Sequence, residues 1–223
     1  MRAVLFDLDG TLVDNMSIHT DAWVEVAAKH GHPTSRDRFI REWAGKKNEE
    51  LIPLMLGREA TPAELTQIAN EKETLYRARA VTELIEVPGT TKLLERLKRA
   101  GRKLAVATAA PEGNRKLVLE GRLNLGRFFD AVVGPEGAPR GKPAPDIFLA
   151  CATQLNVNPT DCVVFEDAPS GITAAKRAGM RCIAVQTAYT LPEDLRDADT
   201  SVASLADVTI DLLKSLQIPS RKG

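Results

Sequence analysis

Short apolar runs alternate with helical patterns along most of the chain. The runs are AVLFDLD, KLAVATA, DAVVG, CVVFED and RCIAVQT, and each lacks a proline and is bounded by turn-forming residues. Such short, nearly uninterrupted apolar segments are typical of parallel strands buried on both faces. Between the runs, helical patterns occupy residues 90–100, 114–123, 145–155 and 170–178. The alternation predicts an α/β fold built on a doubly wound parallel sheet.

One segment breaks this alternation. From Asn15 to Leu84 the pattern is helical throughout, with interruptions at HGHPTS, AGKK and LGREATP and one long amphipathic stretch, PAELTQIANEKETLYRARA. We expect residues 15–85 to form a helical unit inserted after the first strand, and residues 1–14 and 86–223 to form the core. Both junctions would lie beside the carboxyl end of the first strand, where open α/β sheets bind ligands. The insert is therefore expected to cover the site and to govern substrate specificity.

Composition adds little to this picture but excludes some partners. Basic and acidic residues number 30 each, so no net field would recruit nucleic acid or an anionic membrane. The sequence offers no apolar run of membrane-spanning length and no signal peptide. Its three cysteines are scattered without metal spacing, which suits a reducing compartment. We expect a cytoplasmic monomer without nucleic-acid or membrane partners.

The first apolar run ends in DLDGT, which places Asp7 and Asp9 on one face of an extended chain. Two carboxylates this close repel each other unless a cation lies between them. Asp7 can act as a nucleophile toward phosphorus or ligate a hard cation such as Mg²⁺. Asp9 can protonate a leaving oxygen and later activate water. The alternative is an acidic pair that only caps the turn at Gly10.

Three further polar signals accompany later runs. Thr108 ends a run just before a helix, where its hydroxyl can hold a phosphate oxygen or simply cap that helix. Lys142 lies in the turn GKPAP, where its ammonium can neutralise a phosphoryl group or be an ordinary loop lysine. Glu166 and Asp167 end CVVFED and are costly to bury without a cation, although Asp167 can also serve as a helix N-cap.

The carboxyl ends of parallel strands meet at one edge of a sheet, so these four signals predict a phosphoryl-transfer site with one Mg²⁺. In combination they resemble the haloacid dehalogenase superfamily, whose pattern is DxDGT, then a Ser/Thr, a Lys and an acidic pair. The resemblance extends from residue 1 to about residue 188. It implies a Rossmann-like core with a helical cap inserted after the first strand.

The resemblance also implies roles for the matching residues. Asp7 would be the nucleophile, Asp9 the general acid/base, and Thr108 and Lys142 the clamp for the phosphate. The Mg²⁺ ligands would be Asp7, the backbone carbonyl of Asp9, and Asp167, with Glu166 in support.

Within the superfamily, HTDAW, GKPAPDIF and FEDAPSGI look most like the β-phosphoglucomutase-like subgroup. His19 and Lys72 match the cap residues that help to govern the second aspartate, although each can also be an ordinary polar residue on a helix surface. Trp23 can pack in the cap core instead of stacking on substrate. The expected substrate-binding residues are His19, Trp23, Gly45, Lys46, Lys47, Asn48, Lys72, Ala109 and Asn114.

The chain departs from the mutase pattern at four positions. Ala44 and Asn48 replace a lysine and a phosphate-gripping arginine, and Ala110 and Pro111 replace a serine and a lysine. A mutase must grip two phosphates at once, and losing an arginine fork weakens that grip, although Lys46, Lys47 and Asn114 can compensate for the loss. The sequence thus favours an Mg²⁺-dependent phosphatase that hydrolyses a small sugar or polyol phosphate through an aspartyl phosphate.

Two alternatives stay open at this point. A sugar-phosphate mutase would use the same core residues. A non-catalytic phosphoryl-responsive module, such as a receiver domain, also has an acidic cluster and a lysine. Receiver domains are usually shorter and have no helical insert, so the length of this chain counts against them.

Overall fold

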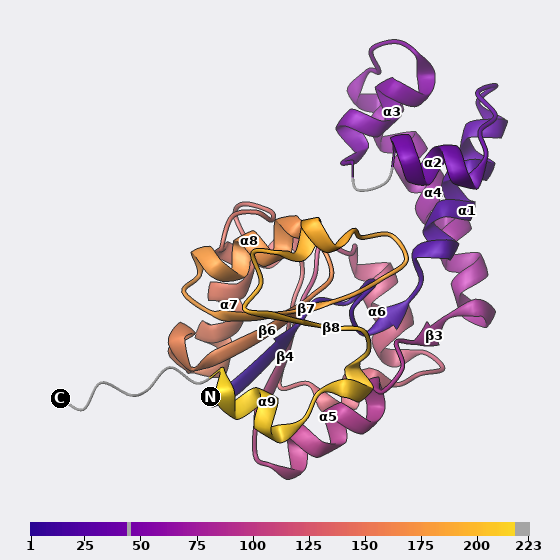
Figure 1. The fold of residues 1–223 in the computed structure, drawn as a ribbon. Helices are drawn as coiled ribbons and strands as arrows, with labels where there is room; N and C mark the ends of the chain where they lie inside the picture. Colours follow the sequence, from indigo (N-terminus) through magenta and orange to yellow (C-terminus); the bar gives the residue numbers. More distant parts are fainter. Residues whose placement is uncertain (44–45, 217–223) are drawn as a thin grey trace. The chain divides into compact units, whose positions relative to one another are not determined.

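The computed structural model describes residues 1–43 and 46–216 of the chain. Its main sheet has six strands in the order β5-β4-β1-β6-β7-β8, and every neighbouring pair is parallel. The strands are β1 (Ala3–Phe6), β4 (Lys103–Ala107), β5 (Ala131–Val133), β6 (Cys162–Glu166), β7 (Arg181–Val185) and β8 (Thr200–Val202). Successive strands are added on one side of β1 and then on the other, which makes the sheet doubly wound. The predicted α/β class is confirmed (Figure 1).

Each of the five apolar runs forms a strand, and the sixth strand was not predicted. β8 is a three-residue edge strand in which Ser201 is exposed and only Val202 is buried. A short, polar edge strand has no apolar run to reveal it, because an edge strand has no neighbour on its outer side.

The core helices are α5 (Thr90–Arg99), α6 (Glu112–Glu120), α7 (Asp146–Leu155), α8 (Pro169–Arg177) and α9 (Ile210–Ser215). The expected bounds of α6, 114–123, are shifted. The helix begins directly after Pro111 and ends at Glu120, just before Gly121, where a Cβ would lie 2.2 Å from the carbonyl oxygen of Leu117. Proline preceding a first turn and glycine following a last turn are the usual boundary residues.

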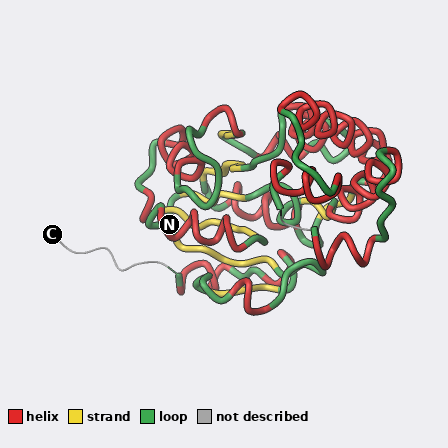
Figure 2. Tube along the Cα trace, turned by 90° about the horizontal axis from the view of Figure 1, so that it is seen from above, coloured by secondary structure: helices red, strands yellow, loops and turns green. Residues whose placement is uncertain are grey.

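One face of the sheet packs against α7 and α8. Alternate residues such as Leu5 of β1 and Ala105 of β4 point to this face, where they meet Phe148 of α7 and Ile172 of α8, all fully buried. Figure 1 shows α7 and α8 on one side of the sheet and α5 and α9 on the other, and Figure 2 shows the strands side by side between helices. Burial of both faces explains why the strands read as continuous apolar runs.

Residues 15–84 form a second unit by their contacts, and Ile85 belongs with the core. The unit consists of α1 (Met16–Lys29), α2 (Arg36–Glu42), α3 (Asn48–Leu56) and α4 (Pro62–Glu83). Its own hydrophobic cluster contains Trp23 and Trp43 together with Phe39 and Ile52. The cluster identifies the two tryptophans as packing residues of the helical unit.

The buried line along α4 is narrow. It consists of Ile68, Lys72, Tyr76 and Ala80, spaced four residues apart, so that a lysine occupies one of the four buried positions. The helix begins with a capping box in which the Thr61 hydroxyl accepts from the Glu64 N–H and the Glu64 carboxylate accepts from the Thr61 N–H.

The chain leaves and re-enters the core through two short antiparallel strands. β2 (Val13–Asp14) pairs with β3 (Ile85–Glu86), so that Asp14 lies opposite Ile85. The Thr90 hydroxyl, fully buried, is 3.0 Å from the carbonyl oxygen of Leu12 and 2.8 Å from that of Val87. These contacts fix both junctions at the core.

Among the helices of the described residues, none combines the length and the apolar composition that crossing a membrane requires.

Candidate active site

Three carboxylates meet where β1 and β6 end. Phe6 lies opposite Phe165 in the parallel register, and the Asp7 N–H donates to the Phe165 carbonyl over 3.0 Å. Asp7, Glu166 and Asp167 are buried, and each offers a carboxylate oxygen within 4.8 Å of the others. Two motifs distant in the sequence therefore form one acidic cluster, because β1 and β6 are neighbours in the sheet.

Lys142 supplies the positive charge of the cluster. Its Nζ lies 2.5 Å from Oδ1 of Asp7 and 2.5 Å from Oε1 of Glu166, and its side chain is only 10% exposed. Burial lowers the pKa of Lys142, but the two carboxylates raise it more, so the net pKa lies above its ordinary value. The ammonium therefore stays charged between the two acids.

The loop that presents Lys142 is held at both ends. The Arg140 guanidinium donates to both carboxylate oxygens of Asp146, over 3.1 and 3.0 Å, and so closes the loop across Lys142. Arg177 of α8 donates to the carbonyl of Pro143 over 3.1 Å. The lysine is thus presented by an ordered turn.

The acidic cluster resists ionisation in the absence of a metal. The pKa of Asp7 is raised to about 7: burial is the largest cause, Lys142 opposes it, and the negative charges of Glu166 and Asp9 add to the rise. Burial, followed by the charges of Glu166 and Asp7, raises the pKa of Asp167 well above its ordinary value. One lysine is therefore insufficient to compensate the buried acids, and a hard dication would complete the charge balance.

The four predicted metal ligands differ in their other contacts. Glu166 is already engaged, since Oε1 contacts Lys142 and Oε2 accepts the Ala168 N–H over 2.8 Å. Asp7 contacts Lys142 through Oδ1 alone. The carboxylate oxygens left without these contacts fit a metal ion held by Asp7 and Asp167, while Glu166 holds Lys142. The backbone carbonyl of Asp9 stays a predicted ligand.

The turn after Asp9 is shaped around Asp167. Gly10 has φ +79°, and a Cβ at this position would lie 2.2 Å from Oδ2 of Asp167. The Thr11 hydroxyl donates to Oδ1 of Asp167 over 3.2 Å. The sequence indicated Gly10 only as a turn residue and did not indicate Thr11 as part of the site. The half-buried Asp9 lies beside this turn.

Thr108 lies one residue beyond β4, the other neighbour of β1, at the same edge of the sheet. It is 1% exposed, its N–H donates to the Val133 carbonyl over 3.1 Å, and its hydroxyl accepts from the Ala110 N–H over 3.0 Å. Because the hydroxyl bonds within the loop before Pro111, it is not the N-cap of α6. Ala109 is exposed, and Asn114 is buried in the first turn of α6.

His19 and Lys72 contact each other inside the helical unit. His19 Nδ1 lies 2.7 Å from Lys72 Nζ, and the imidazole stacks on Tyr76 with ring centroids 4.0 Å apart. Burial, and then the charge of Lys72, lowers the pKa of His19 well below its ordinary value. The imidazole is therefore neutral and accepts at Nδ1. Lys72 is 6% exposed and also donates to Glu73 over 2.8 Å, so the alternative of a solvated lysine is wrong.

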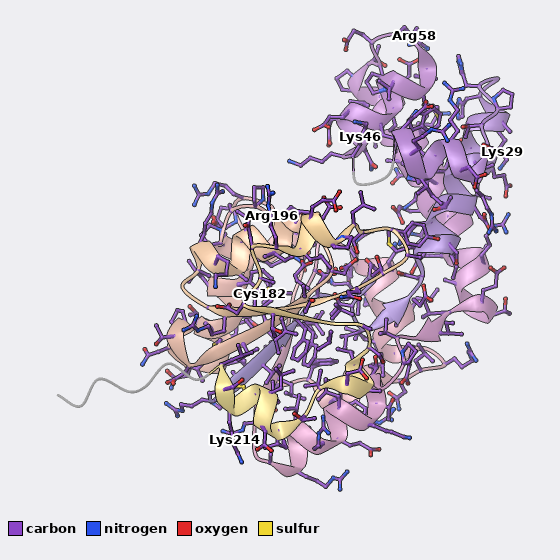
Figure 3. The ribbon with its side chains drawn as sticks, viewed as in Figure 1. Lys29, Lys46, Arg58, Cys182, Arg196 and Lys214 are labelled. Carbon is purple, nitrogen blue, oxygen red and sulfur yellow. The ribbon has the colours of Figure 1, made fainter. Side chains whose placement is uncertain are left out.

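Three further predicted substrate residues, Lys46, Lys47 and Asn48, lie at or just before the start of α3. Lys46 and Lys47 are exposed and Asn48 is half-buried, and Figure 3 shows Lys46 at the surface of the helical unit. Gly45 and Ala44 lie outside the described residues. The substrate-binding roles of all these residues stay predictions.

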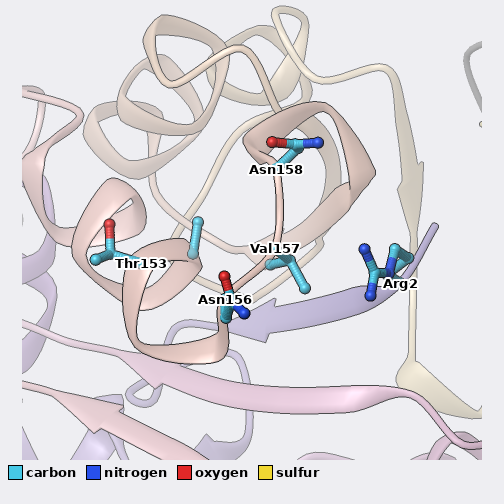
Figure 4. A pocket seen from close by; sticks show the side chains of 6 residues that line it. Arg2, Thr153, Asn156, Val157 and Asn158 are labelled. Atoms are coloured by element: carbon cyan, nitrogen blue, oxygen red, sulfur yellow. The ribbon is translucent and has the colours of Figure 1, made fainter.

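A hollow of about 440 Å³ lies away from the acidic cluster (Figure 4). It is lined by Arg2, Ala152, Thr153, Asn156, Val157 and Asn158. Arg2 precedes β1 and Asn158 precedes β6, so the hollow lies at the amino edge of the sheet, whereas Asp7 and Glu166 lie at the carboxyl edge. Its lining contains none of the candidate catalytic residues.

Comparison with known proteins agrees with this geometry. A family model described as haloacid dehalogenase-like hydrolase matches residues 1–179. A β-phosphoglucomutase of Bacillus subtilis is 34% identical over 220 residues, covering 96% of this chain and 94% of that protein. A phosphorylated carbohydrates phosphatase of Thermotoga maritima is 37% identical over 186 residues, covering 82% and 84%. The crystal structure of a haloacid dehalogenase hydrolase of family IA from Entamoeba histolytica has a TM-score of 0.90 at 32% identity, covering 97% and 99%.

The matched region contains every part of the acidic cluster. Asp7, Lys142, Glu166 and Asp167 all lie within residues 1–179, as does Thr108. With a family model that matches residues 1–179, relatives matched over most of their length and the same fold in a solved structure, this chain belongs to the haloacid dehalogenase-like hydrolases.

Proposed function

We propose that the chain is an Mg²⁺-dependent phosphatase that hydrolyses a small phosphomonoester, a sugar or polyol phosphate. The observation that carries the proposal is the buried cluster of carboxylates. In it Lys142 contacts Asp7 at 2.5 Å, and Asp167 lies close enough to Asp7 for the two to share a metal ion. A carboxylate presented beside a fixed ammonium and a metal position is suited to attack a phosphorus atom whose oxygens are neutralised.

The reaction proceeds in two steps. A carboxylate oxygen of Asp7 attacks phosphorus in line, the bond from phosphorus to the leaving alcohol oxygen breaks, and Asp9 gives its proton to that oxygen. Asp9 then takes a proton from water, which attacks the aspartyl phosphate and releases inorganic phosphate and the Asp7 carboxylate. Lys142 and the Thr108 hydroxyl hold the phosphoryl oxygens. Mg²⁺, held by Asp7, Asp167 and the Asp9 carbonyl, would neutralise phosphoryl charge.

A sugar-phosphate mutase is the second candidate, favoured by the Bacillus subtilis β-phosphoglucomutase that aligns with 96% of this chain. Hydrolysis is preferred because Asn48, Ala110 and Pro111 supply no guanidinium or ammonium for a second phosphate. The Thermotoga maritima phosphatase is a relative that acts on phosphorylated carbohydrates.

The test is a screen of phosphate release over sugar, polyol, nucleotide and glycolate phosphates, with Mg²⁺ and with EDTA. We expect release from at least one sugar or polyol phosphate, and loss of that release in EDTA. A hexose 1-phosphate is then incubated with a trace of the hexose bisphosphate. Isomer formation without net phosphate release would establish the mutase and contradict the phosphatase.

The packing of Glu166 on Gly171 provides a second prediction. A Cβ on Gly171 would lie 1.7 Å from Oε1 of Glu166, the oxygen that contacts Lys142. Gly171→Ala is therefore expected to displace Glu166 and Lys142 and to lower kcat/KM with p-nitrophenyl phosphate by about 10²-fold, since small misplacements of catalytic groups are that costly. Ser170→Ala, at the exposed preceding position of α8, is the control and should retain activity. Full activity in Gly171→Ala would show that Glu166 does not position Lys142.

A further inference from the structure

Arg115 of α6 is a buried cation that the proposed mechanism does not use. The residue is 8% exposed, although it follows the exposed start of a surface helix. Arginine is rarely buried without a partner for its guanidinium. The contacts of this guanidinium therefore indicate what it holds in place.

The guanidinium bridges two loops at the carboxyl edge of the sheet. Nη1 donates to the Ala110 carbonyl over 2.8 Å, in the loop between β4 and α6. Nη1 and Nη2 also contact the two carboxylate oxygens of Glu136, over 3.2 and 2.5 Å, in the turn after β5. At Gly134 a Cβ would lie 1.9 Å from Nη1, so glycine there makes room for the guanidinium. Gly134, the Glu136 carboxylate and the Ala110 carbonyl together form a binding site that matches the planar guanidinium.

The loop held in this way orients Thr108. The Ala110 N–H donates to the Thr108 hydroxyl over 3.0 Å, while the Ala110 carbonyl is the acceptor for Arg115. A threonine hydroxyl has one proton and two acceptor positions. With one acceptor position taken by the Ala110 N–H, the proton cannot point toward that N–H and is available to an oxygen of a bound phosphate. Arg115 thus fixes the residue that sets the direction of this proton.

We propose that Arg115 is a positioning residue for phosphate binding, acting through Ala110 on the Thr108 hydroxyl. The proposal rests on the phosphate-clamp role that the proposed function gives to Thr108. It does not require that the bound phosphate be turned over.

The test is a double-mutant cycle measured by calorimetric titration of the Mg²⁺-loaded protein with inorganic phosphate. Arg115→Met is expected to weaken phosphate binding about 10-fold in the wild-type background and less than about 2-fold in the Thr108→Val background, because residues that act through one another are not additive. Where phosphate binding to Thr108→Val falls below detection, the same cycle is measured on kcat/KM. Arg115→Lys keeps the positive charge but not the planar guanidinium, and should recover part of the phosphate affinity that Arg115→Met loses.

Arg127→Met is the matched control. Arg127 also donates to backbone carbonyls, those of Leu123 and Asn124, but it is exposed and contacts neither loop. Its substitution should leave phosphate affinity unchanged.

The outcomes separate the inference from the proposed function. Equal losses from Arg115→Met in both backgrounds, or no loss in either, would overturn the positioning role and leave a purely structural ion pair. A wild-type protein that binds phosphate but releases none from any ester would overturn the phosphatase, while the cycle would still decide the role of Arg115. A wild-type protein that neither binds phosphate nor releases it from any ester would overturn both.

Discussion

Asp7→Asn is expected to lower phosphate release by on the order of 10⁴-fold or more, because the variant keeps the shape of the side chain but loses the nucleophile. The measurement is turnover of p-nitrophenyl phosphate with Mg²⁺, together with acid trapping of the phosphorylated enzyme, which should be absent from the variant. Asp14→Asn is the control, since Asp14 is an exposed aspartate a few residues further along the same segment. Undiminished turnover in Asp7→Asn would exclude Asp7 as the nucleophile.

The same variant has a consequence for stability. Burial raises the pKa of Asp7 from 3.8 to about 7 in the folded protein, so the folded state binds this proton more tightly than the unfolded state does. The associated stabilisation is complete below about pH 4 and is lost as the pH rises through about 7. Asparagine does not titrate. In EDTA, the melting temperature of Asp7→Asn relative to wild type should therefore rise between pH 5.5 and pH 8.5, and a constant difference would contradict the raised pKa.

Lys142→Met is expected to have the largest effect on stability and a large effect on activity. Removing the ammonium leaves Asp7 and Glu166 buried without their shared cation, and breaking a buried ion pair in this way costs about 3–5 kcal/mol. The loss of a fixed charge at the phosphoryl oxygens should lower kcat by on the order of 10²- to 10³-fold. The measurements are urea unfolding of the metal-free protein and steady-state kinetics with Mg²⁺.

The pH dependence distinguishes this explanation from a simple packing defect. Without Lys142, which opposes the rise, the folded-state pKa of Asp7 lies further above its unfolded value, so the destabilisation should grow from pH 5.5 to pH 8.5. Lys176→Met is the control, because Lys176 pairs with Asp199 at 2.7 Å with its side chain 37% exposed, and its loss should cost much less at both pH values. A destabilisation independent of pH would point to lost packing instead of unpaired charge.

The core fold could be predicted because its strands are buried on both faces. The runs that became β1, β4, β6 and β7 are apolar without interruption, and the glycines or prolines around them fixed where helices begin and end. β8 was missed because Thr200 and Ser201 have no such pattern. The helical unit could be predicted from its helical pattern without strands. The burial of Lys72 on α4 could not, since helical spacing alone places a lysine on the solvated face.

The residues of the site, too, could be predicted from the sequence only in part. Asp7, Lys142, Glu166 and Asp167 could be predicted to meet, because strand ends in a parallel sheet converge on one edge. Arg115 could not, because its carboxylate partner Glu136 lies in a different loop and an arginine on a helix is usually a surface residue. The available signal was Gly134 directly after an apolar run, since a glycine at a strand end can mark a close approach by another group.

The pairing of β2 with β3 means that the helical unit between them could be replaced by another inserted module. Asp14 and Ile85 lie opposite each other, so the ends of the insertion are as close as the ends of a hairpin turn. Closing a longer loop costs only a slowly growing, logarithmic amount of entropy. The sheet can therefore accept a different module at this point without changing the register of β1 or β6. Replacing the helical unit between Asp14 and Ile85 would therefore leave Asp7 and Glu166 in place at the ends of β1 and β6.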